Sequence, residues 1–199
     1  MASPVLTVIA GCNGSGKSSF SNAITSKHAP SFDYDKVFLE KYNSLQDSEI
    51  RENMAHNMAR LELESAIHDS IIKNLDFTYE TNFNSTPLYW PENFKNSGFI
   101  LRLVFFCLNS IDEAKRRVQI RVENGGHFVP DIEIKERYYL GFEHLNEYWQ
   151  YFDEIYLFDT STYNKKPRFL LSILNHKINE LVEFPQYLVS LIPNIKRLE

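Results

Sequence analysis

The sequence has few cysteines and no long apolar run. Its 199 residues include only Cys12 and Cys107, too few for a disulfide framework. The longest apolar stretch, residues 99–108, is interrupted by Arg102 and is shorter than the roughly 20 residues that cross a bilayer. No charged leader precedes the first apolar residues, so we expect no signal peptide. These features predict a cytoplasmic protein in a reducing compartment.

An excess of positive charge is also missing. The net charge is −5, so no general basic field would attract nucleic acid. The six histidines show no spacing typical of metal ligands. Repeats and low-complexity segments are absent from the sequence, and its hydrophobic content is ordinary for a globular protein. Length and composition therefore favour one domain with a substantial core.

The most informative stretch is residues 11–18, which match the phosphate-loop pattern G-x-x-x-x-G-K-[ST]. An apolar run at residues 5–10 precedes it as a buried strand, and residues 19–24 follow without Gly or Pro, as a helix should. Glycines let successive backbone N–H groups point at phosphate oxygens, and a helix N-terminus adds partial positive charge. The predicted nucleotide-binding residues are Gly11, Cys12, Asn13, Gly14, Ser15, Gly16, Lys17, Ser18 and Ser19.

Three side chains of this loop have predicted chemistry. Lys17 is expected to contact the outer phosphates, and the Ser18 hydroxyl is expected to ligate Mg²⁺. A glycine turn between a strand and a helix is the alternative interpretation of the same pattern. Cys12 lies among converging N–H groups beside Lys17, which favours its thiolate, and the alternative is an inert thiol directed into the core.

Strands and helices alternate along the chain. Strands are predicted at residues 5–10, 31–35, 77–81, 99–108 and 154–158, and helices at residues 19–27, 45–75, 87–96, 110–124 and 130–152. This order predicts an α/β fold, that of a kinase-type P-loop NTPase, with a parallel sheet of about five strands flanked by helices. Residues 1–165 would form this domain. Residues 166–199 would form a hairpin and a tail helix packed on it.

Polar residues are expected at one edge of this sheet, because ligands of parallel sheets bind at the carboxyl ends of strands. The second strand would deliver Asp35 there and the third would deliver Glu80. Asp35 is a candidate base for a substrate hydroxyl, or else a helix N-cap or turn carboxylate. Glu80 is a candidate for Mg²⁺, held through water, or for substrate, or else an exposed charge at a strand end.

A helical lid is predicted at about residues 111–137. Arg117 and Arg121 are four residues apart and share one helix face, and Arg137 follows after a turn that contains glycine. Two helices around such a turn could aim arginines at a γ-phosphate. Ordinary surface pairing, for instance between Glu133 and Arg137, is the alternative.

One part of many NTPases is missing. After the loop, no apolar strand ends in tandem acids, and residues 99–108 lead instead into Asn109 and Ser110. Motor-type and signalling NTPases usually carry such an acid for Mg²⁺. Its absence favours a small-molecule kinase in which Ser18, water and phosphates hold the metal.

Together these pieces resemble the zeta toxin family, often described as UDP-N-acetylglucosamine kinases. The resemblance covers about residues 5–161 and includes the loop, Asp35 and the Glu80-Thr81 pair. Its most specific segment is Arg117-Val118-x-x-Arg121-Val122-x-x-Gly125-Gly126-His127-Phe128-Val129-Pro130, followed by Ile134 and Arg137-Tyr138. The chain departs from the family pattern at Cys12 (usually Pro), at residues 82–83 (Asn-Phe for Thr-Leu) and at residues 159–161 (Asp-Thr-Ser for Asp-Asn-Ser).

The resemblance implies phosphorylation, by ATP or GTP with Mg²⁺, of a hydroxyl on a UDP-activated amino sugar. It implies Asp35 as the base, with Lys17, Arg121 and Arg137 at the phosphates. The predicted substrate-binding residues are Glu80, Thr81, Arg117 and His127.

The family also contains both toxins with an antitoxin partner and standalone enzymes, so an antitoxin is a candidate partner, whereas neither nucleic acid nor a membrane is expected. The alternative functions are a kinase for another hydroxyl, such as an antibiotic or nucleoside, and a nucleotide-binding regulator that does not catalyse.

Overall fold

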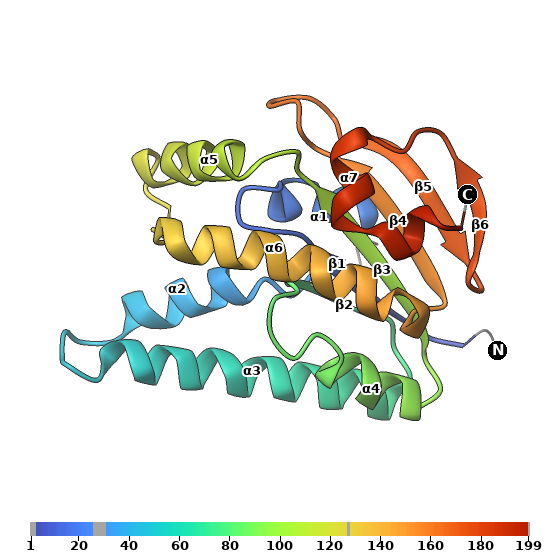
Figure 1. Cartoon of the computed structure of the whole chain (residues 1–199). Helices are drawn as coiled ribbons and strands as arrows, with labels where there is room; N and C mark the ends of the chain where they lie inside the picture. The colour runs from blue at the N-terminus through green and yellow to red at the C-terminus, as the bar shows by residue number, and fades with distance from the viewer. Residues whose placement is uncertain (1–2, 26–30, 127, 199) are drawn as a thin grey trace.

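A six-stranded sheet in the order β2-β1-β3-β4-β5-β6 forms the centre of the computed structural model, which describes residues 3–25, 31–126 and 128–198 (Figure 1). β2, β1, β3 and β4 are parallel, and the antiparallel hairpin β5–β6 extends the sheet from β4. The strands are β1 (Val5–Ala10), β2 (Phe77–Thr81), β3 (Ile100–Cys107), β4 (Glu154–Asp159), β5 (Arg168–Leu174) and β6 (Lys177–Leu181). The carboxyl ends of the four parallel strands therefore meet at one edge.

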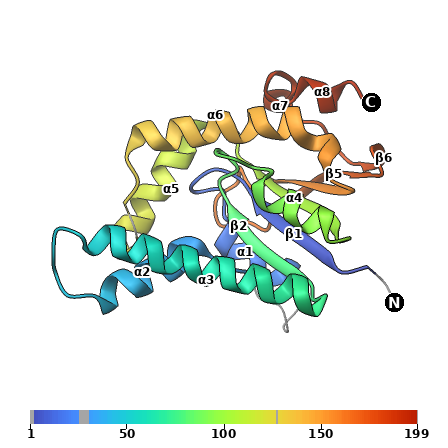
Figure 2. The ribbon, with the colours of Figure 1, turned by 90° about the horizontal axis from the view of Figure 1, so that it is seen from below.

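Helices cover both faces of the sheet. α6 and the tail helices α7 and α8 lie on one side and α1 lies on the other, while α2 and α3 run beside the edge strand β2 (Figures 1 and 2). The helices are α1 (Lys17–Ile24), α2 (Tyr34–Ser44), α3 (Arg51–Lys73), α4 (Tyr89–Asn96), α5 (Ile111–Glu123), α6 (Asp131–Tyr148), α7 (Gln186–Leu191) and α8 (Pro193–Lys196), with a 3₁₀ turn at Trp149–Tyr151. This arrangement confirms the predicted α/β fold.

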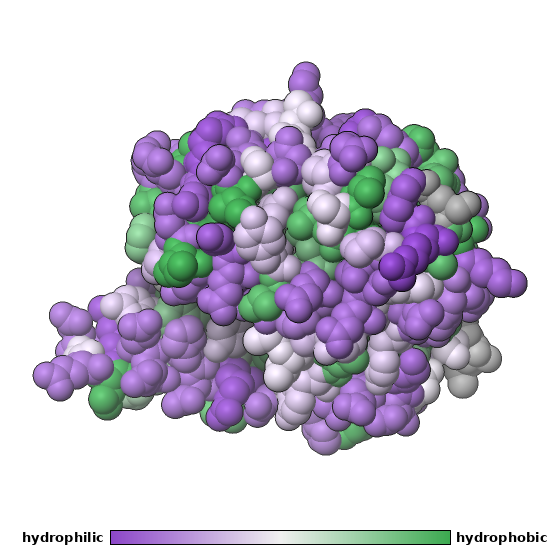
Figure 3. Space-filling view, viewed as in Figure 1, coloured by the Kyte–Doolittle hydropathy of each residue, from purple (hydrophilic) through white to green (hydrophobic). Residues whose placement is uncertain are grey.

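The core follows the two-residue period of the strands. Leu103 of β3 belongs to the larger cluster, which includes the inner face of α6, whereas Val104 belongs to a smaller cluster with Phe20 of α1. Apolar residues therefore fill both sides of the central strands. On the outside, Figure 3 shows a largely hydrophilic surface with scattered hydrophobic side chains.

The expected strand at residues 31–35 is wrong. Only Phe32 makes a bridge, to Tyr79 of β2, and the chain then enters α2. The Asp33 carboxylate accepts a hydrogen bond of 3.1 Å from the Lys36 N–H and thereby caps this helix. Asp35 consequently lies in the first helical turn and not at a strand end. The N-cap that had been weighed as an alternative for Asp35 belongs to its neighbour, Asp33.

The helix predicted at residues 45–75 is confirmed in part, as α3. It is shorter than expected, and its buried face is made mainly of small side chains such as Ala55 and Ala59, followed by Leu63 and Ile67. Several larger apolar residues of α3, including Met54, are exposed instead. Small residues on the buried face allow α2 to pack closely on α3.

The bounds of the remaining elements agree with the predicted bounds to within one to three residues at most ends. The predicted C-terminal hairpin and tail helix are among these elements. The first helix, predicted to end at residue 27, ends at Ile24, and residues 26–30 lie outside the described residues. Within the described ranges, no helix is both long enough and apolar enough to span a bilayer.

The central strand should dominate stability. Leu103 is fully buried, so Leu103→Ala is expected to lower the free energy of unfolding by about 2–5 kcal/mol through lost packing and a residual cavity. Leu61 on α3 is 59% exposed. Leu61→Ala should therefore change the free energy of unfolding by less than about 0.5 kcal/mol. Urea denaturation of both variants tests this, and equal losses would contradict the assigned core.

Candidate nucleotide and acceptor site

The phosphate loop is fixed between the backbones of β3 and α5. At Gly11, a Cβ would lie 2.6 Å from the Phe106 carbonyl oxygen of β3. At Gly14, where φ is +79°, a Cβ would lie 2.8 Å from the Ala114 carbonyl oxygen of α5. Both approaches require glycine, because a side chain would collide with main-chain atoms that cannot move independently. The loop therefore has little freedom.

The loop leads directly into α1, whose first turn begins at Lys17. The first N–H groups of a helix have no intrahelical partners and carry partial positive charge. The Ser15 hydroxyl is buried beside them and has no hydrogen-bond partner among the described residues. An unsatisfied buried donor next to free helix N–H groups fits a phosphate group, which accepts several hydrogen bonds.

The Lys17 ammonium is directed back into the loop. It donates to the carbonyl oxygens of Gly11 at 2.7 Å and Cys12 at 3.1 Å, and to the Asn82 side-chain oxygen at 3.0 Å. Burial lowers the pKa of Lys17, and the nearby charges of Glu80 and Asp35 partly oppose this effect. The structure thus places the Lys17 ammonium among loop carbonyls, with carboxylates nearby, and its predicted contact with phosphates stays a prediction.

Ser18, in the first turn of α1, lies in contact with Glu80 near the end of β2. The Ser18 hydroxyl donates to the Glu80 carboxylate at 2.7 Å. Burial raises the pKa of Glu80, whereas the hydrogen bond from Ser18 opposes that shift. Hydroxyl and carboxylate oxygens are the ligands that Mg²⁺ prefers, so the residues present fit a magnesium ion beside bound phosphates.

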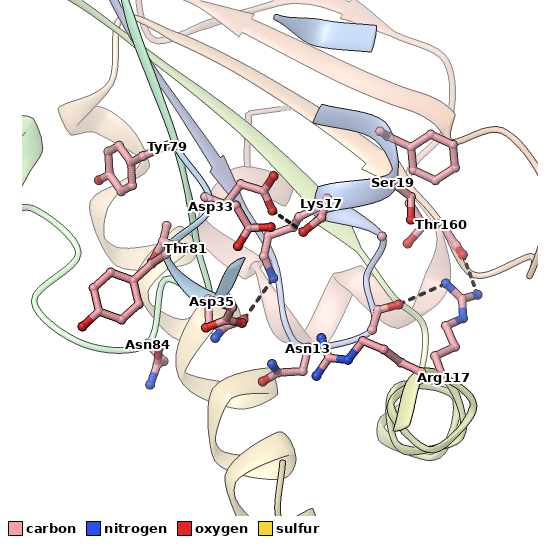
Figure 4. A pocket seen from close by; sticks show the side chains of 18 of the residues that line it. Asn13, Lys17, Ser19, Asp33, Asp35, Tyr79, Thr81, Asn84, Arg117 and Thr160 are labelled. Carbon is pink, nitrogen blue, oxygen red and sulfur yellow. Dashed lines mark hydrogen bonds between the residues drawn. The ribbon is translucent and has the colours of Figure 1, made fainter. Parts of the chain in front are cut away.

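A pocket of about 710 Å³ joins the loop to the ends of the neighbouring elements. In Figure 4, Asp33, Asp35, Tyr79, Thr81 and Asn84 lie to one side of Lys17, and Arg117 and Thr160 lie to the other. Asp35 therefore lines the same pocket as the loop even though a helix, and not a strand, presents it. We call the Asp35 side the acceptor half and the Arg117 side the nucleotide half, after the roles that are proposed for the two sides below.

Arg117 braces the loop from α5. Its guanidinium pairs with Glu113 at 2.6 Å and donates to the carbonyl oxygens of Gly14, Thr160 and Ser161 at 3.3, 2.8 and 3.2 Å. Its side chain is only 9% exposed. These contacts hold the loop against the segment that follows β4, in addition to placing Arg117 at the pocket wall.

The other predicted lid residues lie around the same loop. Arg121 lines the pocket from α5, and Arg137 of α6 donates to the Asn13 side chain at 3.2 Å while also pairing with Glu133. The surface pairing weighed against the lid is therefore present, together with a contact to the loop. The Thr81 hydroxyl accepts from the Phe83 N–H, and His127 lies outside the described residues.

The expectation of a Cys12 thiolate is wrong. Cys12 is 4% exposed, and burial raises its pKa to about 11. The neighbouring charge of Lys17 lowers the pKa, but by less than burial raises it. The thiol is thus neutral at neutral pH and buried in the core, which is the alternative interpretation.

Comparison with known proteins gives structural matches only. No protein-family model and no curated protein sequence matches the chain. A protein from Chloroflexus aurantiacus described as a "putative kinase" is 20% identical, with a TM-score of 0.55 over 67% of this chain and 75% of that one. A chain of the PezAT toxin–antitoxin system of Streptococcus pneumoniae is 12% identical, with a TM-score of 0.61 over 96% of this chain and 79% of that one.

A third match is the structure of AvrRxo1-ORF1:-ORF2 with ATP, at 11% identity and a TM-score of 0.64. The alignment includes 98% of this chain but only 62% of the matched chain. This chain therefore spans less than two thirds of that protein. The chain shares its α/β fold with these proteins. At these identities the comparisons establish the fold alone.

Within this α/β fold, the C-terminal segment anchors the nucleotide half. The Asp159 carboxylate accepts from the Ser161 N–H at 2.9 Å, from Arg168 of β5 at 2.8 Å and from the Tyr187 hydroxyl of α7 at 3.1 Å. Burial raises the pKa of Asp159, but hydrogen bonds from Ser161 and Arg168 outweigh it and lower the pKa overall. The hairpin and tail thus hold the segment after β4 to which Arg117 donates hydrogen bonds.

Sequence reasoning missed several residues of the pocket. Asn82, which contacts Lys17, had been noted only as a departure from the family pattern, although its place directly after Glu80-Thr81 was a usable signal. Tyr89 and Trp90 of α4 and Tyr163 after β4 also line the pocket, and nothing in their local sequence indicated it.

Arg117 and Arg116 offer a matched test of the brace, because both pair with Glu113 but only Arg117 reaches the loop. Arg117→Ala is expected to lower the free energy of unfolding by about 2–4 kcal/mol, since it leaves the carbonyl oxygens of Gly14, Thr160 and Ser161 without this buried donor, whereas Glu113 keeps its pair with Arg116. Arg116→Ala should have a much smaller effect, because Arg116 is far more exposed. Urea denaturation compares them, and similar losses would show that the loop contacts contribute little.

Proposed function

We propose that this protein is a small-molecule kinase that transfers the γ-phosphoryl group of ATP or GTP to a hydroxyl group. The proposal is supported by one observation above the others: Lys17, the Ser18–Glu80 pair and Asp35 line a single pocket beside the phosphate loop. A phosphate cradle alone would suit a nucleotide-binding regulator. A carboxylate on the acceptor side is what proton removal from a hydroxyl requires.

The proposed chemistry divides among the residues by position. The loop N–H groups and Lys17 would hold the outer phosphates, with Arg121 and Arg137 near the transferred group. Asp35 would take the proton of the acceptor hydroxyl as the new oxygen–phosphorus bond forms and the bond to the bridging oxygen breaks. Ser18 and Glu80 would hold Mg²⁺, which neutralises phosphate charge when bound. Thr81, Arg117 and His127 stay proposed substrate contacts.

The acceptor and the protein partner are finer proposals. A UDP-activated amino sugar follows from the resemblance to the zeta toxin family, and an antibiotic or nucleoside hydroxyl is the alternative. PezAT is a toxin–antitoxin system, which supports an antitoxin as the corresponding partner of this chain. ATP turnover measured against a panel of UDP-sugars, nucleosides and aminoglycosides, with mapping of the product, identifies the acceptor. Absence of transfer to every hydroxyl, with ATP bound, would favour the regulator.

Asp35→Asn separates acceptor chemistry from nucleotide binding. The amide keeps the shape of the side chain but accepts a proton poorly, so transfer should fall by roughly 10²–10⁴-fold. ATP affinity should change only a few-fold, because Asp35 lies in the acceptor half. Glu40→Gln, an exposed change on the same helix, is the control and should leave both quantities unchanged. Transfer at the wild-type rate in Asp35→Asn would make Asp35 a structural carboxylate and Glu80 the next candidate base.

A further inference from the structure

The Lys17 ammonium has no hydrogen to spare in this arrangement. A protonated lysine carries three N–H donors. The contacts to Gly11, Cys12 and Asn82 account for that number, at 2.7, 3.1 and 3.0 Å. A phosphate oxygen can therefore gain a hydrogen bond from Lys17 only if one of these contacts is given up.

The three acceptors differ in their freedom to leave. The Gly11 and Cys12 oxygens are main-chain atoms of a loop held between β3 and α5. Moving either one would displace the loop that forms the phosphate site. The Asn82 oxygen belongs to a side-chain amide, which can rotate about its own bonds without moving any backbone.

The backbone around Asn82 is itself rigid. The next residue, Phe83, is fully buried and has a φ of +60°, which is uncommon for a bulky side chain. Its N–H donates to Thr81 Oγ1 at 3.0 Å, and its carbonyl oxygen accepts from His144 Nδ1 of α6 at 2.8 Å. A turn held from both sides cannot swing away, so only the side chain of Asn82 can release Lys17.

The opposite side of this turn is equally close-packed. A Cβ at Gly141 of α6 would lie 3.0 Å from the Asn82 carbonyl oxygen, so the helix and the turn are in near contact. The position of Asn82 is thereby tied to α6, the helix that also delivers Arg137 to the loop.

We propose that Asn82 is a positioning residue for Lys17, and that a nucleotide phosphate replaces its side-chain oxygen as the third acceptor when nucleotide binds. This inference rests on the proposed function and adds a residue to it. Without nucleotide, Asn82 keeps the ammonium directed at the loop and fully hydrogen-bonded. With nucleotide, rotation of the amide frees one donor for the phosphate, and the backbone carbonyls continue to hold the other two.

If phosphate replaces the Asn82 oxygen as an acceptor of Lys17, two substitutions of Asn82 should have opposite effects on ATP affinity. Asn82→Leu has nearly the same shape but no acceptor, so ATP no longer competes with it and should bind about three- to tenfold more tightly. Asn82→Asp places a carboxylate against the ammonium and should weaken ATP binding by more than about tenfold. An asparagine that only supports the turn would lower affinity in both cases.

The measurement is ATP affinity by isothermal titration calorimetry on the full chain, without any acceptor. Acylation of Lys17 by an N-hydroxysuccinimide ester, followed by mass spectrometry in the absence of nucleotide, gives a second readout and should be faster in Asn82→Leu than in wild type. Asn96→Leu, an exposed substitution of the same kind on α4, controls for general effects and should match wild type in both assays. Asn82→Ala, confirmed as folded by circular dichroism, serves as a second variant and should behave like Asn82→Leu.

The outcomes separate this inference from the proposed function. If wild-type protein binds neither ATP nor, in a parallel titration, GTP, the kinase proposal fails and the exchange fails with it. If wild type binds ATP but Asn82→Leu and Asn82→Ala bind it no more tightly than wild type, the exchange alone is wrong and the kinase proposal stands. Tighter binding in these variants, with weaker binding in Asn82→Asp, supports the exchange.

Discussion

Burial of the Lys17 ammonium against the carbonyls of its own loop is the constraint on which the rest of the structure depends. An enclosed ammonium is costly unless its hydrogens are bonded, so the Gly11 and Cys12 oxygens must turn toward it. That curvature leaves the loop pressed on the backbones of β3 and α5, where only glycine fits. The loop, β3 and α5 are thus fixed against one another.

The chain meets this requirement with contacts from residues far apart in sequence. Tyr187 and Arg168 hold Asp159, Asp159 holds Ser161, and the carbonyl of Ser161 is one of the acceptors of Arg117, which also bonds to Gly14. The C-terminal hairpin and tail therefore stabilise the phosphate loop without lining it. On the acceptor side, Asn82 contacts Lys17 of the loop, and a hydrogen bond from α6 holds the turn that carries Asn82.

Local patterns in the sequence predicted those features of the fold that depend on interactions between neighbouring residues. The apolar run of β1, the glycine-containing loop and the start of α5 after Ser110 could be predicted because each depends on neighbouring residues. Asp35 was assigned to a strand end because nothing in the pattern showed that Asp33 would cap a helix two residues earlier. The pKa of the Cys12 thiol depends on how completely the surrounding core excludes water. The position of Asn82 beside Lys17 depends on a turn that α6 holds. Both are properties of the folded chain that spacing does not contain.

Titration of ATP with Mg²⁺ into wild-type protein and into Lys17→Ala, by calorimetry on samples shown to be folded, tests the central claim most directly. The account predicts that wild type binds ATP and that Lys17→Ala binds at least about tenfold more weakly, because a charge-assisted contact to phosphate is lost. Lys36→Ala, an exposed lysine on α2, should bind as wild type does. Undiminished ATP affinity in folded Lys17→Ala would contradict a phosphate site built around Lys17.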